Sequence, residues 1–199
     1  MFRLRGIILA SAVFCVGAGA SDAGRALRVR VRLYSAAAVP PRVIDYATEE
    51  CTRIFKDAGI VIEWATAGDS QVDDLNLSIA DNAIRGARAD AVGYVVRTSV
   101  GASAVVVWSR VIRLTAYHRP AFEIMGRVMA HEIGHLLLAD GSHSAVGVMR
   151  ARWFLNDLNA TSAQHFFFTR EEQSQMRRQI LSRNFKTSPS LLSLWNTPQ

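Results

Sequence analysis

The segment His131-Glu132-Ile133-Gly134-His135 restricts the possible folds of this 199-residue chain more than any other stretch of its sequence. Two histidines four positions apart lie on one face of a helix, one turn from each other, so both rings can reach the same point. Each ring can offer a nitrogen to a zinc ion at about 2.0–2.1 Å. Glu132 is offset around the helix and can reach a water molecule at the metal without becoming a ligand. The spacing therefore predicts a zinc site on a helix, with a general base beside it.

The residues on both sides of this segment are those expected of a buried helix. Pro120 suits a helix start, and no other proline occurs between Phe122 and Ala139. The neighbouring residues are apolar, and buried histidine and glutamate side chains without partners are costly, a cost that a metal ion removes. Gly134 is less favourable than alanine in a helix interior by about 1 kcal/mol. We therefore expect another element to pack closely against Gly134.

A catalytic zinc site needs a third protein ligand and one open position. His143 is the first choice, because Asp140-Gly141-Ser142 is turn chemistry that can bring the chain back toward the helix. Asp140 is the alternative ligand, and a glutamate at the start of a later helix, Glu171 or Glu172, is a weaker alternative. The predicted site therefore consists of the metal ligands His131, His135 and His143 and the catalytic residue Glu132.

Around this motif the chain resembles the metzincin metalloproteases, whose signature is H-E-x-x-H-x-x-G-x-x-H followed by a methionine turn. The first half of the signature is intact, but Leu138 stands at the glycine position and Gly141 at the third histidine position. His143 therefore comes two residues late, as though the turn carried a short insertion. Ser144 and the run Gly147-Val148-Met149 look like the His-Ser pair and the methionine turn of matrix-type members.

The run HEIGHLLLADGSHSAVGVMRARW also resembles a group of predicted bacterial secreted metzincin-like proteins. The resemblance rests on motifs over residues 120–153 and on topology alone over residues 27–119. It implies an α/β (α+β) fold with a twisted, mostly parallel five-stranded sheet, an antiparallel edge strand, an active-site helix and a C-terminal helix. It also implies a zinc metalloendopeptidase with one catalytic Zn²⁺ ion and a peptide or protein substrate.

The resemblance assigns further roles. An extended substrate would pair with the antiparallel edge strand over Val92–Arg97. Met149 would form an apolar floor beneath the metal. The residues expected to contact the substrate backbone are Val92, Gly93, Tyr94, Val95 and Val96.

The alternative function is a secreted binding protein, zinc-bearing or metal-free, that has no catalytic turnover.

Apolar patterns predict the remaining elements. Ala26 to Tyr34 alternates between apolar and mainly arginine residues, which is typical of a strand with one apolar face. The next helical and strand patterns favour a parallel β-α-β unit, and the short link Thr98 to Gly101 permits a hairpin. The expected strands are 26–34, 60–65, 75–80, 92–97 and 104–108, and the expected flanking helices are 43–58 and 169–183.

Residues 1–20 are typical of a secretory signal peptide. Arg3 and Arg5 precede an apolar run, and Ala18-Gly19-Ala20 fits the small-residue cleavage rule. We expect a secreted or periplasmic protein, and an N-terminal membrane anchor is the alternative. The apolar run is short, so no stable membrane span is expected after cleavage. The predicted organisation is a signal peptide at 1–20, a metzincin-like catalytic domain at 21–185 and a flexible tail at 186–199.

Composition limits the other classes of function. Half of the residues are hydrophobic and 20% are charged, as in globular domains. Loss of Arg3 and Arg5 would lower the formal charge from +6 to +4, which is too weakly basic to predict nucleic-acid binding. Cleavage would also remove Cys15, so Cys51 would remain without a disulfide partner in the same chain. Its helical neighbours favour a buried core position. The sequence does not indicate an oligomeric state.

Overall fold

The computed structural model describes residues 27–65, 68, 71, 73–99, 101–115, 119–138, 143–153 and 166–187. In this part of the chain, five strands form one sheet in the order β2-β1-β3-β5-β4. The strands are β1 (Leu27–Ser35), β2 (Ile60–Ala65), β3 (Leu75–Ala80), β4 (Gly93–Thr98) and β5 (Gly101–Val107). β1 pairs in parallel with β2 and β3, and β3 pairs in parallel with β5, whereas β4 is an antiparallel edge strand. The expected five-stranded sheet is confirmed.

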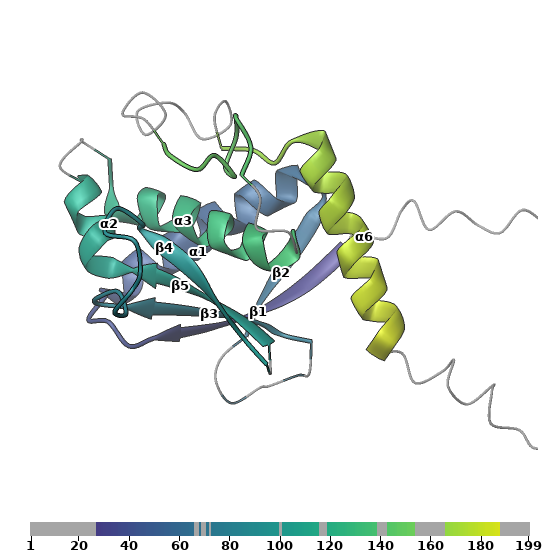
Figure 1. Ribbon diagram of the computed structural model, residues 1–199, viewed down its shortest axis with the longest axis horizontal. Coiled ribbons are helices and arrows are strands. Elements are labelled where there is room, and N and C mark those ends of the chain that lie inside the picture. Colours follow the sequence, from purple (N-terminus) through teal and green to yellow (C-terminus); the bar gives the residue numbers. More distant parts are fainter. Residues whose placement is uncertain are drawn as a thin grey trace, which may run out of the picture.

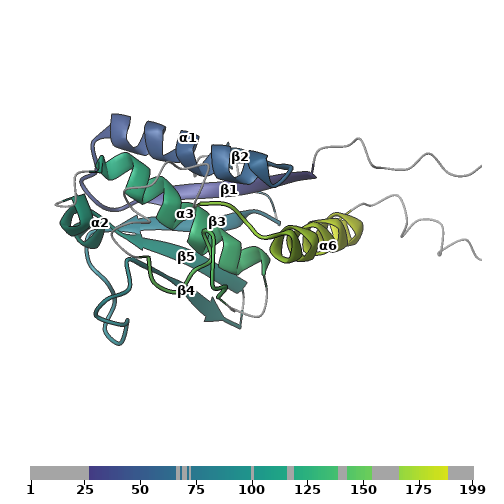
Figure 2. The same cartoon turned by 90° about the horizontal axis from the view of Figure 1, so that it is seen from above.

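The described helices are α1 (Pro41–Asp57), α2 (Trp108–Leu114), α3 (Ala121–Leu137) and α6 (Arg170–Thr187). Figure 1 shows α1 and α3 side by side on one face of the sheet, with α6 at one end of this two-layer body. The view from above in Figure 2 agrees with this arrangement. None of the helices in the described ranges is long and apolar enough to cross a membrane.

The core lies between the sheet and the helix pair α1 and α3. Val29 and Val31 point from β1 into this core, while the arginines that alternate with them point to the other face. On α1 the inward positions follow helical spacing and include Cys51, which is fully buried, as expected. Gly126 on α3 allows the two helices to approach closely, because a Cβ atom there would lie 2.6 Å from the Ala47 carbonyl oxygen.

Several strand boundaries differ from the sequence prediction. β1 runs one residue later than expected, β4 ends at Thr98, and β5 begins at Gly101, three residues before the expected start. Val92 precedes β4, although its carbonyl accepts a hydrogen bond of 2.8 Å from the Val107 amide. Trp108 is the first residue of α2 and not the last of β5. The apolar run that ends at Trp108 is equally compatible with a strand or a buried helix start, so local pattern could not separate them.

At the C-terminal end, α6 continues to Thr187, beyond the expected end at Arg183 and across the expected tail boundary at residue 185. Residues 1–26 and 188–199 lie outside the described ranges, and so does the expected signal peptide. The expected capped start of this helix is present, because the Glu172 amide donates to Thr169 Oγ1 at 3.3 Å and the Thr169 amide donates to Glu172 Oε2 at 2.7 Å.

Candidate metal centre

The helix α3 carries the predicted motif through the middle of the molecule. Pro120 stands at its N-terminal boundary in an extended conformation, as its sequence position predicted. Most of the helix is buried, because α1, the sheet and the segment 143–153 surround it. Glu132 and His135 are among the few buried polar residues of the described chain. The fold therefore places the polar side chains of the motif in a largely apolar setting.

Three histidine side chains meet at one point. His135 Nε2 lies 3.1 Å from His131 Nε2 and 3.2 Å from His143 Nε2. Donor atoms of the three residues all lie within 4.8 Å of one another. Nitrogens bound to one tetrahedral zinc ion at 2.0–2.1 Å would be separated by about 3.3–3.4 Å. The structure thus brings together the three predicted ligands at spacings close to those of a zinc site.

The tautomer of His131 supports metal binding. Its Nδ1 lies 2.7 Å from the Val148 carbonyl oxygen, which can only accept, so Nδ1 carries the proton and donates it. Burial lowers the pKa of His131 to about 4, so the ring is neutral near pH 7 and Nε2 presents a lone pair. Burial, and then the charge of Arg88, also lower the pKa of His143.

This protonation pattern leaves the three nitrogens short of hydrogens. His131 Nε2 has none to donate, so the two short contacts to His135 Nε2 can include at most one linear N–H···N hydrogen bond. The nitrogens of the other close pair would then lie 3.1 or 3.2 Å apart without a linear hydrogen bond between them and would repel each other. A cation placed between the rings would remove this repulsion, and a neutral imidazole is a common zinc ligand. The donor set therefore fits a zinc ion.

Glu132 lies beside the histidines and does not join their cluster. Its side chain is buried, and its Oε2 atom has no hydrogen-bond partner within the ranges that the structure describes. Burial raises the pKa of Glu132 to about 8. A nearby divalent cation would lower this pKa again and stabilise the carboxylate. A buried, poorly solvated carboxylate at this position is suited to accept and return a proton.

Gly134 explains how Met149 reaches the metal centre. A Cβ atom at position 134 would lie 2.5 Å from Met149 Sδ and 3.1 Å from a ring carbon of Phe168. The expected close packing of another element against this glycine is therefore present. Met149 is fully buried. Its sulfur packs against α3 at Gly134, the residue before His135. This is the methionine for which an apolar floor beneath the metal was predicted.

Backbone hydrogen bonds hold the segment that carries His143. The Ser144 amide donates to the Met149 carbonyl at 3.0 Å, and the Val148 amide donates to the Phe167 carbonyl at 2.9 Å. The Ser144 hydroxyl donates to Glu172 Oε1 at 2.7 Å. Glu172, considered above as an alternative ligand, is thus occupied in capping α6 and holding this turn. The other main alternative, Asp140, lies outside the described residues.

A second group of side chains behind the ligands was not foreseen from the sequence. The Trp153 ring meets His131 edge-on at 5.7 Å, and Phe166 meets Trp153 at 5.2 Å. Arg127, which is 1% exposed, lies over the Phe166 ring at 4.2 Å. Its charge is balanced by two glutamates, Glu50 at 3.4 Å and Glu123 at 3.1 Å. A sequence signal did exist, because Arg127 lies one turn before His131 in the otherwise apolar stretch 124–130.

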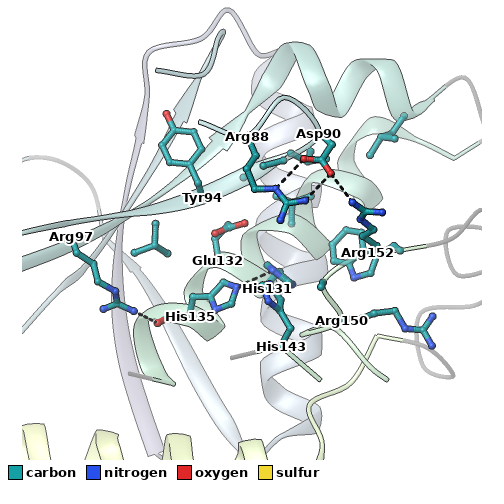
Figure 3. A pocket seen from close by; sticks show the side chains of 18 residues that line it. Arg88, Asp90, Tyr94, Arg97, His131, Glu132, His135, His143, Arg150 and Arg152 are labelled. Atoms are coloured by element: carbon teal, nitrogen blue, oxygen red, sulfur yellow. Dashed lines mark hydrogen bonds and ion pairs between the residues drawn. The ribbon is translucent and has the colours of Figure 1, made fainter. Parts of the chain in front are cut away.

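The histidines open into a cleft of about 770 Å³ below β4. Gly93, the first residue of β4, lies directly against Glu132, because a Cβ atom at position 93 would be 2.5 Å from Oε1. Val92, Tyr94 and Val95 also line the cleft, whereas Val96 does not. Figure 3 shows Arg88 and Asp90 reaching the cleft beside the histidines. Neither residue was predicted from the sequence to belong to the site.

Comparison with known proteins identifies the fold. No family model and no curated protein matches the sequence. Among solved structures, the chain is similar to archaemetzincin from Methanopyrus kandleri, with a TM-score of 0.54 and 14% sequence identity. The similarity covers 79% of this chain and 98% of the archaemetzincin chain. The fold is therefore metzincin-like, as the resemblance implied, and it carries a three-histidine cluster that could hold a metal ion.

Proposed function

We propose that this protein is a secreted zinc-dependent metalloendopeptidase that cleaves peptide or protein substrates. His131, His135 and His143 would hold one zinc ion, and Glu132 would act as the general base. The single observation that carries the proposal is the convergence of three imidazole nitrogens beside a buried carboxylate at the floor of a cleft. The metzincin-like fold supports the same function.

A bound zinc ion would supply a Lewis acid that polarises the scissile carbonyl and makes water a better nucleophile. Glu132 would take the proton of the attacking water and later deliver it to the leaving amine. The outer edge of β4 would pair with the substrate backbone and hold the scissile bond over the histidines. Burial of Glu132 keeps competing water away from its carboxylate.

The proposal predicts that removal of the base separates metal binding from catalysis. Glu132→Gln should keep one zinc per chain and lose about 10²–10⁴-fold in kcat. His143→Ala should lose zinc and activity together, because the remaining two ligands bind the ion more weakly. Elemental mass spectrometry measures the zinc content, and cleavage of casein or of a peptide mixture measures the activity.

Asp140→Ala is the matched control, because it changes the segment that the sequence predicts to turn before His143 and should leave zinc content unchanged. If only the Asp140 variant lost zinc, the ligand assignment would be wrong. A wild-type protein that holds one zinc and cleaves no peptide would instead favour a zinc-bearing binding protein.

Secretion and the relation to matrix-type or bacterial secreted metzincins are part of the proposal on sequence grounds alone. The signal-like segment 1–20 supports export. The run Gly147-Val148-Met149 supports the relation to matrix-type members. N-terminal sequencing of the exported protein would locate the cleavage site, which we expect after Ala20.

A further inference from the structure

The cleft at the candidate metal centre contains more arginine than acidic side chains. Among its described lining residues, Arg88, Arg97, Arg150 and Arg152 are cationic, and only Asp90 and Glu132 carry carboxylates. Glu132 is buried beside the histidines, so Asp90 is the acidic group on the more exposed part of the described lining. The described part of the surface that would meet a substrate is therefore predominantly cationic.

Two of these arginines share one carboxylate. Arg88 donates to Asp90 at 3.2 and 2.9 Å, and Arg152 lies 3.6 Å from the same carboxylate. The side chains of Arg88 and Arg152 are 71% and 74% exposed. Each guanidinium has five N–H donors, more than Asp90 engages, and two cations around one anion leave a net positive charge. This arginine pair can therefore accept an additional carboxylate.

The loop that carries Arg88 and Asp90 is held in place from α2. Arg110 donates to the Arg88 carbonyl at 2.8 Å and also to the Ala91 carbonyl. These bonds connect the loop backbone to the helix that follows β5. The position of Arg88 at the cleft is thus set by the fold as well as by its ion pair with Asp90.

Arg97 supplies a cation on the other side of the histidines (Figure 3). It is an exposed residue of the edge strand β4 and donates to the His135 carbonyl at 3.2 Å. This acceptor is neutral, so the hydrogen bond orients Arg97 without cancelling its charge. A peptide extended along β4 would meet a guanidinium on either side of the metal centre.

We propose, on the basis of the function proposed above, that this cleft selects peptides with a glutamate or aspartate side chain close to the scissile bond. Guanidinium groups match carboxylates in shape and can bind them through two parallel hydrogen bonds. Backbone pairing with β4 is independent of side-chain identity, whereas the arginines distinguish an acidic peptide from a neutral or basic one. The same charges disfavour peptides with lysine or arginine at these positions.

The test begins with the zinc-loaded wild-type protein and a degenerate peptide mixture, in which mass spectrometry locates the cleaved bond. Matched peptides with glutamate, glutamine or lysine next to that bond, on either side, are then compared by kcat/KM. We expect the glutamate peptide to exceed the glutamine peptide by about tenfold and the lysine peptide to be the poorest. The preference should shrink as ionic strength rises, because salt screens exposed charges.

Variants assign the preference to each side of the cleft. The double variant Arg88→Gln/Arg152→Gln should bring the ratio of kcat/KM for the glutamate and glutamine peptides toward one when the acidic residue lies on one side of the scissile bond. Arg97→Gln should have the same effect when the acidic residue lies on the opposite side. Arg85→Gln is the control: it removes one arginine charge from the loop that carries Arg88, but Arg85 does not line the cleft. This control should keep the wild-type ratio.

The outcomes separate this inference from the proposed function. Equal kcat/KM values for the three peptides overturn the acidic preference while the peptidase function stands. A preference that survives both sets of arginine variants also overturns it. If the zinc-loaded protein cleaves nothing in the mixture, the proposed function fails and this inference fails with it.

Discussion

Two glycines determine how closely other elements approach the histidine–glutamate motif. Gly134 lets the Met149 sulfur and the Phe168 ring contact α3, and Gly93 lets β4 lie against the Glu132 carboxylate. Any side chain at either position would occupy space that these neighbours already fill. The role of Gly134 could be anticipated, since a glycine inside a helix needs a packing reason. The role of Gly93 depends on a contact between residues far apart in the sequence.

Gly93→Ala should impair catalysis with little effect on stability. The added methyl would meet Glu132 at 2.5 Å, and the long glutamate side chain can move aside more easily than the backbone can. A displacement of the base by about 1 Å can lower kcat about 10²-fold. Steady-state kinetics measures kcat, thermal unfolding measures stability, and zinc content shows whether the variant still binds the ion.

Gly68→Ala is the control, because a Cβ atom there would contact nothing within 4 Å. It should leave kcat and stability unchanged within about 0.5 kcal/mol. A Gly93→Ala protein with wild-type kcat would show that Glu132 tolerates this displacement or is not the base.

At the scale of secondary structure, the arginine face of β1 is used to hold neighbouring strands. Arg28 pairs with Glu63 of β2 at 2.6 Å. On the other side, Arg30 and Arg32 pair with Asp74, at the entrance to β3, at 3.1 and 2.8 Å. Alternation in the sequence predicted this polar face, but the acidic partners became evident only from the sheet order.

Asp74 should make the stability of the sheet pH-dependent. Its side chain is 2% exposed, and burial acting alone would raise its pKa. The Gln71 amide, Arg32 and Arg30 together outweigh that effect and lower the pKa below the usual value of about 3.9. The stabilisation is therefore fully present above about pH 4 and is lost as the pH falls through the lower, folded-state pKa.

Asp74→Asn should lower the free energy of unfolding at pH 7 by roughly 1–3 kcal/mol and weaken its dependence on pH below about 4. Urea unfolding at a series of pH values measures both effects. Asp73→Asn, at the exposed neighbouring position, should lower stability much less. Equal losses in the two variants would contradict the role given to Asp74.

For the whole molecule, the histidine cluster brings together parts of the chain that are held by different elements. His131 and His135 belong to α3, whereas His143 belongs to a segment attached to α6 through Ser144 and Glu172. An ion held by all three would connect the active-site helix to the C-terminal helix. Binding to the folded state alone stabilises a protein in proportion to the logarithm of ligand concentration.

Zinc should therefore raise the unfolding temperature of the wild-type protein, and a chelator should lower it. When the free zinc concentration is about 100 times the dissociation constant, the free energy of unfolding should rise by about 2.7 kcal/mol. Differential scanning calorimetry at buffered zinc concentrations measures it. In His143→Ala most of the dependence should disappear, and an unfolding temperature of the wild type that is independent of zinc would contradict the predicted linkage.

Local patterns in the sequence were sufficient for much of the fold and for the proposed ligands. The alternation in β1, the helical spacing in α1 and the spacing of the two histidines in α3 all reflect the geometry of a single element. The fold class and the strands from Ile60 and Leu75 were predicted correctly because neighbouring residues determine such periodicities. His143 could be proposed because a turn-forming segment precedes it.

Tertiary structure alone decided which distant residues surround these elements. The order β2-β1-β3-β5-β4 places Gly93 against Glu132, and the loop before β4 brings Arg88 to the cleft. Burial of Arg127 likewise depends on α1 and on Phe166, which come from opposite ends of the described chain. Such contacts join residues far apart in sequence, and periodicity along one element contains no information about them.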